Sequence, residues 1–489
     1  MAVKWQKPVL VGGISLSLAL WMWQSWQQTL GEVGGMTLWG VVVAYTGYRW
    51  FKRQQPKVMP VVNQVPVNPE KVLRAIATTQ NLIQQLHTET TNPADLADIP
   101  NLETQLSQLS PSLDRSTINL LVTGGKGVGK TTLINLLDTQ PAFIPALNSH
   151  ITLNLTETPP LFTPDAANLD LENTLNYDLV LFLTNGDLTD SEFQTLSPLA
   201  QQQHTCLVFN KQDQYEPVAV AKISAQLKQR VIGLSSPVTV LGISTAPRSI
   251  KVVQQQVVGE AQSWLEAPEP DLASLTQKLQ QTINQEGQQL VLATTLRQVQ
   301  SLQQRVMAKL HQGRCDRSQP IIEQYQWIAA ATAFANPVPM LDLLATGAIN
   351  AQLIMDLGQI YQQKISLAQA ENAVAVLAEL LIKLGVVEFS TQTIGHLLKS
   401  NALTYVAGGL IQGASAAYLT RVSGLGLITY FQENSEQLDQ EITQFNVGRL
   451  QAIIQKVYQQ NQLPILQGLV QQATQKFFAP KDSLNLKQT

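Results

Sequence analysis

The run Gly124-Gly125-Lys126-Gly127-Val128-Gly129-Lys130-Thr131 decides the fold of this chain. The apolar residues 118–122 before it predict a buried strand, and residues 132–137 after it have a helical pattern. The run fits G-x-x-x-x-G-K-[ST] at every fixed position, in the strand–loop–helix context that this motif requires. Backbone N–H groups of such a loop bind phosphate oxygens, as does the positive end of the helix. The sequence therefore predicts a phosphate-binding loop from Gly124 to Thr132.

Two side chains of this loop have further expected roles. Lys130 is expected to reach the outer phosphates of a nucleotide, and the Thr131 hydroxyl is expected to bind Mg²⁺. The alternative is a Gly-rich turn without a ligand, which the agreement of the motif with both flanks disfavours.

A second motif, Asn210-Lys211-Gln212-Asp213, follows the apolar strand 207–209. A carboxylate at Asp213 can accept from the ring N–H and the exocyclic amine of guanine, and adenine offers no such pair of donors. Residues 238–246 are expected to form a strand that ends in a small-residue loop behind the base. The expected ligands are GTP and GDP with Mg²⁺, and the expected guanine-binding residues are Asn210, Lys211, Asp213, Ser244 and Thr245.

On these motifs, residues 116–266 resemble an Era-type GTPase domain of the P-loop class. The alternation of predicted strands and helices indicates an α/β fold with a mostly parallel sheet and helices on both faces. The last helix of this domain is expected at Ile250–Leu265, closed by prolines at 268 and 270.

The chain departs from this family at Glu157-Thr158-Pro159-Pro160, where the family has D-T-P-G. Glu157 is a candidate to reach the metal through a water molecule. Pro160 replaces a glycine whose N–H binds the γ-phosphate, and proline has no N–H. Thr152 and Ser149 are the candidates for a further Mg²⁺ ligand. No catalytic residue is assigned, and GTP hydrolysis is expected to be slow or dependent on a partner.

Residues 1–53 predict a transmembrane hairpin. Val9–Trp26 carries no charge and would be about 27 Å long as a helix, and Met36–Phe51 is a second apolar run. Lysines and arginines flank the pair, which places the N-terminus and the bulk of the chain in the cytoplasm. The expected location is an inner, plasma-type or internal membrane. A re-entrant hairpin in one leaflet remains the alternative, whereas the absence of a small-residue cleavage site disfavours a signal peptide.

The remaining chain is expected to be helical around the GTPase domain. Residues 54–68 predict a proline-spaced linker, and 69–115 a helical segment with helices at 69–87 and 102–109. The C-terminal helical domain, 271–489, begins with a long amphipathic helix over 271–312, followed by a polar turn around Cys315. Its apolar part, 318–489, resembles the YcjF-like helical domain of unknown function in the phrases 336–342 and 418–424. A bundle core is favoured there, and a lipid-dipping hairpin within 404–431 stays open.

Composition limits the partners. The net charge is −3 and charged residues make up 14%, so there is no overall basic field and no nucleic acid is expected as a partner. Two unclustered cysteines indicate neither a disulfide framework nor a zinc site. Guanine nucleotide and the lipid bilayer are the expected partners, with self-association through the helical region left open. Three functions compete: a membrane-anchored nucleotide switch, a hydrolysis-deficient scaffold, and a dynamin-like membrane remodeller.

Overall fold

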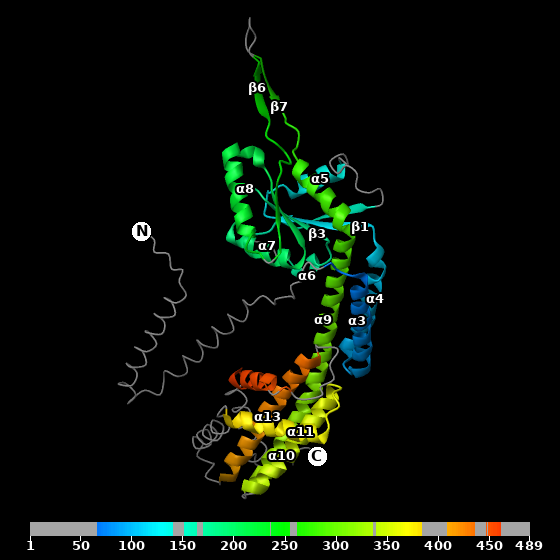
Figure 1. Ribbon diagram of the computed structural model, residues 1–489, viewed down its shortest axis with the longest axis vertical. Helices are drawn as coiled ribbons and strands as arrows, with labels where there is room; N and C mark the ends of the chain where they lie inside the picture. Colours follow the sequence, from blue (N-terminus) through cyan, green and yellow to red (C-terminus); the bar gives the residue numbers. More distant parts are fainter. Residues whose placement is uncertain are drawn as a thin grey trace, which may run out of the picture.

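A computed structural model describes the protein over residues 66–139, 151–163, 170–234, 236–254, 262–335, 339–383, 408–435, 446 and 448–460. The predicted membrane hairpin at 1–53 and most of the linker at 54–68 lie outside these residues. Within the described ranges, no helix combines the length and the apolar character needed to cross a bilayer. Figure 1 shows an α/β domain joined by one long helix to a helical bundle.

The sheet has five parallel strands in the order β2-β1-β3-β4-β5. Apolar side chains line its strands, and all six residues of β3 are buried, because helices cover both faces of a parallel sheet. This arrangement confirms the predicted α/β fold. The strands are β1 (Thr117–Gly124), β2 (Thr152–Glu157), β3 (Leu179–Thr184), β4 (His204–Phe209) and β5 (Thr239–Gly242).

Each face of the sheet has its own apolar core. Leucines of α5 (Lys130–Thr139) and of the start of α9 (Ala273–Ala335) pack on one face. Those of α7 (Asp190–Gln202) and α8 (Pro217–Val231) pack on the other. The start of α9 is therefore part of the α/β domain as well as of the helical region.

The predicted helix at Ile250–Leu265 is wrong. The structure has an antiparallel ribbon there, formed by β6 (Ile250–Gln254) and β7 (Gln262–Glu266), which projects away from the sheet (Figure 1). β-branched residues at 250, 252 and 253 favour a strand. The first turns of α9 also occupy the sheet face against which a last helix would pack.

Helix α9 has 63 residues, about 95 Å at the usual rise, and it continues through Cys315. The predicted polar turn around Cys315 is therefore also wrong. The helix persists because it packs successively on the sheet, on α3 (Pro69–Glu89) and α4 (Pro93–Leu109), and on the C-terminal helices. Helix α4 begins at Pro93, earlier than predicted, because the Asn92 side chain caps its first turn.

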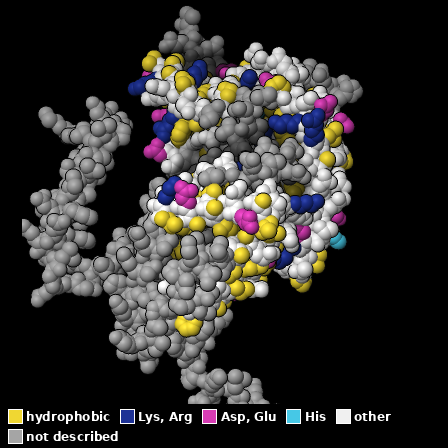
Figure 2. Space-filling view, turned by 60° about the horizontal axis from the view of Figure 1, so that its bottom comes forward, with side chains coloured by type: hydrophobic (Ala, Val, Ile, Leu, Met, Phe, Trp, Pro, Cys, Tyr) yellow, Lys and Arg dark blue, Asp and Glu magenta, His cyan; other side chains and the backbone are white. Residues whose placement is uncertain are grey.

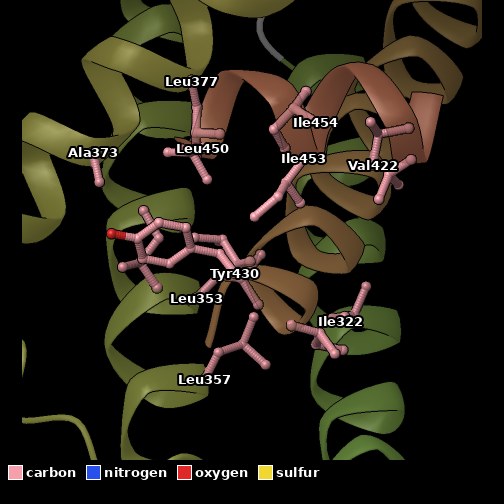
Figure 3. Packing of buried hydrophobic residues seen from close by; sticks show 14 of the residues in the cluster. Ile322, Leu353, Leu357, Ala373, Leu377, Val422, Tyr430, Leu450, Ile453 and Ile454 are labelled. Carbon is pink, nitrogen blue, oxygen red and sulfur yellow. The ribbon is translucent and has the colours of Figure 1, made fainter. Parts of the chain in front are cut away.

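The C-terminal bundle packs around aromatic and aliphatic side chains. Tyr430 lies near Leu353, Leu357 and Leu450 in the core between the helices (Figure 3). Its helices are α10 (Pro339–Ile360), α11 (Leu367–Lys383), α13 (Gly408–Ser435) and the helical segment 448–460, which pack with the end of α9.

Glycines of α13 allow its close contact with α9. A Cβ atom added at Gly413 would lie 2.8 Å from the Ala330 carbonyl oxygen, and one at Gly424 would lie 2.8 Å from Ile322. The Gly- and Ala-rich composition of this segment therefore serves helix packing within the protein.

Charged side chains are sparse on the face shown in Figure 2. Lysines and arginines lie scattered, several beside acidic residues, among neutral polar atoms. The described side chains on this face form no extended basic surface.

Candidate nucleotide site

The predicted phosphate loop lies between the end of β1 and the start of α5. Three of its glycines have positive φ angles: 146° at Gly124, 72° at Gly127 and 95° at Gly129. A Cβ atom at Gly129 would also lie 2.3 Å from the side-chain nitrogen of Asn210. Because side chains are strained at such angles, this loop geometry requires glycine. Lys126, Val128 and Thr132 complete the loop that the sequence predicts.

Lys130 is buried under this loop, with 4% of its surface exposed. Its ammonium group donates to the carbonyl oxygens of Gly124 at 3.1 Å and Gly125 at 3.0 Å. Burial lowers the pKa of Lys130, and the nearby negative charge of Glu157 partly offsets this effect. Among the described residues, the ammonium group thus bonds only to neutral carbonyl groups of the phosphate loop, where an anion would stabilise it.

Thr131 and Glu157 lie together beside the loop. The Thr131 hydroxyl is 2.9 Å from Oε1 and 2.8 Å from Oε2 of Glu157. Hydroxyl and carboxylate oxygens are ligands that suit Mg²⁺. The extra methylene of glutamate therefore does not keep this carboxylate away from the predicted metal site.

Thr152, one of the two candidates for a further Mg²⁺ ligand, does not lie beside this pair. Thr152 pairs with Thr117 at the start of β1, and their hydroxyl oxygens are 2.9 Å apart. Thr152 therefore lies at the end of the sheet opposite the phosphate loop, because its strand runs parallel to β1. Ser149 lies outside the described residues.

The Glu157–Pro160 segment runs along β1 toward the phosphate loop. The Thr158 N–H donates to the Val122 carbonyl at 3.0 Å, and the Leu161 N–H donates to the Gly124 carbonyl at 3.1 Å. Pro159 and Pro160, between them, have no N–H. Residues 158–161 therefore have no free N–H group to offer to a third phosphate.

Asn210 connects the phosphate loop to the predicted base-binding loops. Its side chain is fully buried, and its Nδ2 donates to the Val128 carbonyl at 2.8 Å and to the Thr245 hydroxyl at 3.0 Å. Its Oδ1 accepts from the N–H groups of Thr245 at 3.0 Å and Lys211 at 2.8 Å. The Lys211 backbone is left-handed, with φ of 63°. One side chain thus holds three separate loops together.

Asp213 lies on the exposed side of the same cluster. Its N–H donates to the Ser244 hydroxyl at 3.2 Å, and its Oδ2 accepts from the Arg248 N–H at 3.1 Å. The structure thus brings Asn210, Asp213, Ser244 and Thr245 together next to the phosphate loop.

Asp271 lies next to this site, which the sequence analysis did not predict. Ser244 and Asp271 form a two-way backbone pair with both N–H···O distances at 2.9 Å. The Asp271 carboxylate also accepts from the Ala273 N–H at 3.2 Å, in the first turn of α9. An aspartate just before a long helical pattern is a usual helix-capping signal, so the start of α9 was detectable, but its pairing with Ser244 was not.

One part of the chain matches a known protein family. A family model described as a domain of unknown function, DUF697, matches residues 297–463. The match begins inside α9 and covers much of the helical region predicted from 318 onward. Among curated proteins, none matches the chain.

Three solved structures show low similarity. The G domain of the T. maritima FeoB iron transporter is 16% identical, over 26% of this chain and 88% of that chain, with a TM-score of 0.19. The complex of SsGBP with GDP is 17% identical, over 36% and 64%, with a TM-score of 0.21. The bacterial dynamin GTPase LeoA from ETEC is 10% identical, over 83% and 98%, with a TM-score of 0.25. At these scores the similarities carry no functional weight, and the function proposed below rests on this chain's own residues.

Proposed function

We propose that this protein binds GTP and GDP and acts as a slow GTPase switch on the cytoplasmic face of a membrane. The observation that carries the nucleotide part is the buried side chain of Asn210. Its hydrogen bonds join the phosphate loop to the predicted base-binding loops at the carboxyl ends of the parallel strands, where α/β proteins bind ligands.

Different residues bind different parts of the nucleotide. The loop N–H groups and Lys130 bind the phosphates, while Asp213 accepts from guanine beside Ser244 and Thr245. Thr131 and Glu157 would hold Mg²⁺, which neutralises charge on the outer phosphates when bound.

Slow hydrolysis is inferred from the Glu157–Pro160 segment. A third phosphate gains no N–H donor from residues 158–161, so the charge that develops on it during hydrolysis lacks that stabilisation. The same observation favours a second candidate function, a hydrolysis-deficient scaffold that guanine nucleotide stabilises. Phosphate release separates the two, because only the switch turns GTP over.

We propose that α9 connects the nucleotide site with the helical region. Ser244 beside the base is bonded to Asp271, and Asp271 caps α9, which extends into the bundle.

Membrane attachment is proposed from the pattern of residues 1–53. A chain that lacks these residues should leave the membrane fraction on alkaline extraction, whereas the full chain should stay.

The test of nucleotide binding is titration of the full-length protein with GTP, GDP and ATP in the presence of Mg²⁺, followed by phosphate release. We expect guanine-selective binding that Lys130→Ala abolishes. Asp213→Asn should shift the preference from guanosine toward xanthosine nucleotides, because the amide presents a donor where the carboxylate accepts. Equal GTP and ATP affinities in the wild type, or unchanged GTP affinity in Lys130→Ala, would contradict the proposal.

A further inference from the structure

A cavity of about 350 Å³, lined by both polar and apolar side chains, lies beside the amino-terminal ends of the strands, at the opposite end of the sheet from the phosphate loop. Its walls come from the end of α7, the start of β4, one side of α9, the residues just before α3 and the loop before β5. The polar residues that line it are Gln201, Gln202, Gln203, His204, Ser236, Glu286, Gln289 and Arg297. This volume is at the lower end for small-molecule sites, so it suits a ligand smaller than a nucleotide.

Arg297 contributes a buried positive charge to this cavity. The residue is 7% exposed, and its Nη2 donates to the Tyr177 carbonyl at 3.1 Å and to the Thr294 hydroxyl at 2.8 Å. Its Nε has no hydrogen-bond partner among the described residues. Burial lowers the pKa of Arg297 to about 10, so it stays charged at neutral pH.

Asp178, the carboxylate whose charge acts on Arg297, already has other hydrogen-bond partners. Asp178 accepts from Arg115 at 2.8 and 2.5 Å and from the Asn119 N–H at 2.7 Å. It makes no hydrogen bond to Arg297 among the described contacts. A buried guanidinium group is costly unless an anion pairs with it, and a planar oxyanion matches its N–H groups.

Other residues that line the cavity further limit which ligand fits. Gln202 also lines the cavity, although its Oε1 is enclosed by protein atoms and has no partner among the described residues. Burial lowers the pKa of His204, which keeps it neutral at pH 7. Glu286 is the acidic residue of the lining, and it lies eleven positions before Arg297, about 16 Å along α9.

We propose that this cavity is a second ligand site, which binds a small carboxylate or phosphate through Arg297. The site is separate from the nucleotide site and stands independently of the proposed GTP binding.

The test titrates the full-length protein with inorganic phosphate, acetate and glycolate by calorimetry, with and without saturating GDP. We expect saturable binding of at least one anion with a Kd of about 0.1–10 mM. GDP should not displace glycolate, since the nucleotide occupies the other end of the sheet.

Variants assign the binding to this cavity. Arg297→Gln should weaken anion binding at least tenfold. Arg305→Gln is the matched control, because it makes the same charge change on α9 at an exposed arginine that bonds Gln105. Gln202→Glu leaves Arg297 in place and should also weaken binding, through charge repulsion. This variant decides the question if Arg297→Gln does not fold.

Three results would overturn the proposal: no saturable binding of any of the anions, equal binding by wild type and Gln202→Glu, or equal losses in the two arginine variants. GDP affinity, measured on the same samples, reports separately on the nucleotide site.

Discussion

Asn210→Ala is the substitution that tests the nucleotide site most directly. The truncation removes the group that joins the phosphate loop, at Val128, to the loop that contains Thr245. Both contacts are buried, so water cannot replace the lost hydrogen bonds without opening the loops. The Val128 carbonyl and the Thr245 N–H then lose these partners.

The magnitude follows from these two contacts. An unsatisfied buried backbone group costs about 1–3 kcal/mol, so for the two groups we expect a loss of about 2–6 kcal/mol in the stability of the loop arrangement. If a bound nucleotide must restore that arrangement, its affinity falls by about 30-fold to 20,000-fold.

The assay measures GDP affinity by calorimetry and thermal unfolding by circular dichroism on the same protein. Asn101→Ala is the control, because Asn101 is an exposed asparagine on α4 that bonds only neighbouring side chains of its own helix. It should leave both measurements unchanged. GDP affinity within threefold of wild type in Asn210→Ala would refute the view that this side chain holds the loops in place.

Three further substitutions test other parts of the structure. Gly129→Ala should abolish GDP binding in equilibrium dialysis, because its Cβ would lie 2.3 Å from the buried asparagine amide at a φ of 95°; retained binding would show that the loop relaxes. Asp178→Asn should destabilise the protein by about 3–5 kcal/mol, seen as a lower unfolding midpoint, since it leaves Arg115 without its buried carboxylate; an unchanged midpoint would contradict this. Burial alone would raise the pKa of Glu89. The hydrogen bonds and positive charges of Arg314 and Arg317 outweigh this effect and lower the pKa below its usual value of 4.5. The ionised group therefore stabilises the α3–α9 contact above pH 4.5, and this contribution is lost as the pH falls through the lower, folded-state value. On acidification below pH 4.5, the wild-type midpoint should fall more steeply than that of Glu89→Gln, and parallel curves would exclude this contribution.

The sequence by itself determined the strand–loop–helix around Lys130 and the position of Asn210 at the end of a strand. These predictions succeeded because each depends on a local pattern: an apolar run long enough for a buried strand, followed by residues with special backbone or hydrogen-bonding needs. Parallel strands then bring their carboxyl ends to one edge of the sheet. The departure at Pro160 was also visible, since the missing N–H is a property of the residue itself.

Only the tertiary structure decided which segment covers the sheet beside α5. The segment 250–265 has an ambiguous pattern, and the start of α9 takes the position that a helix there would occupy. The same long-range packing carries α9 through Cys315, pairs Ser244 with Asp271, and buries Arg297 against the amino-terminal ends of the strands. These contacts join residues far apart in the chain, so no local pattern of side chains specifies them.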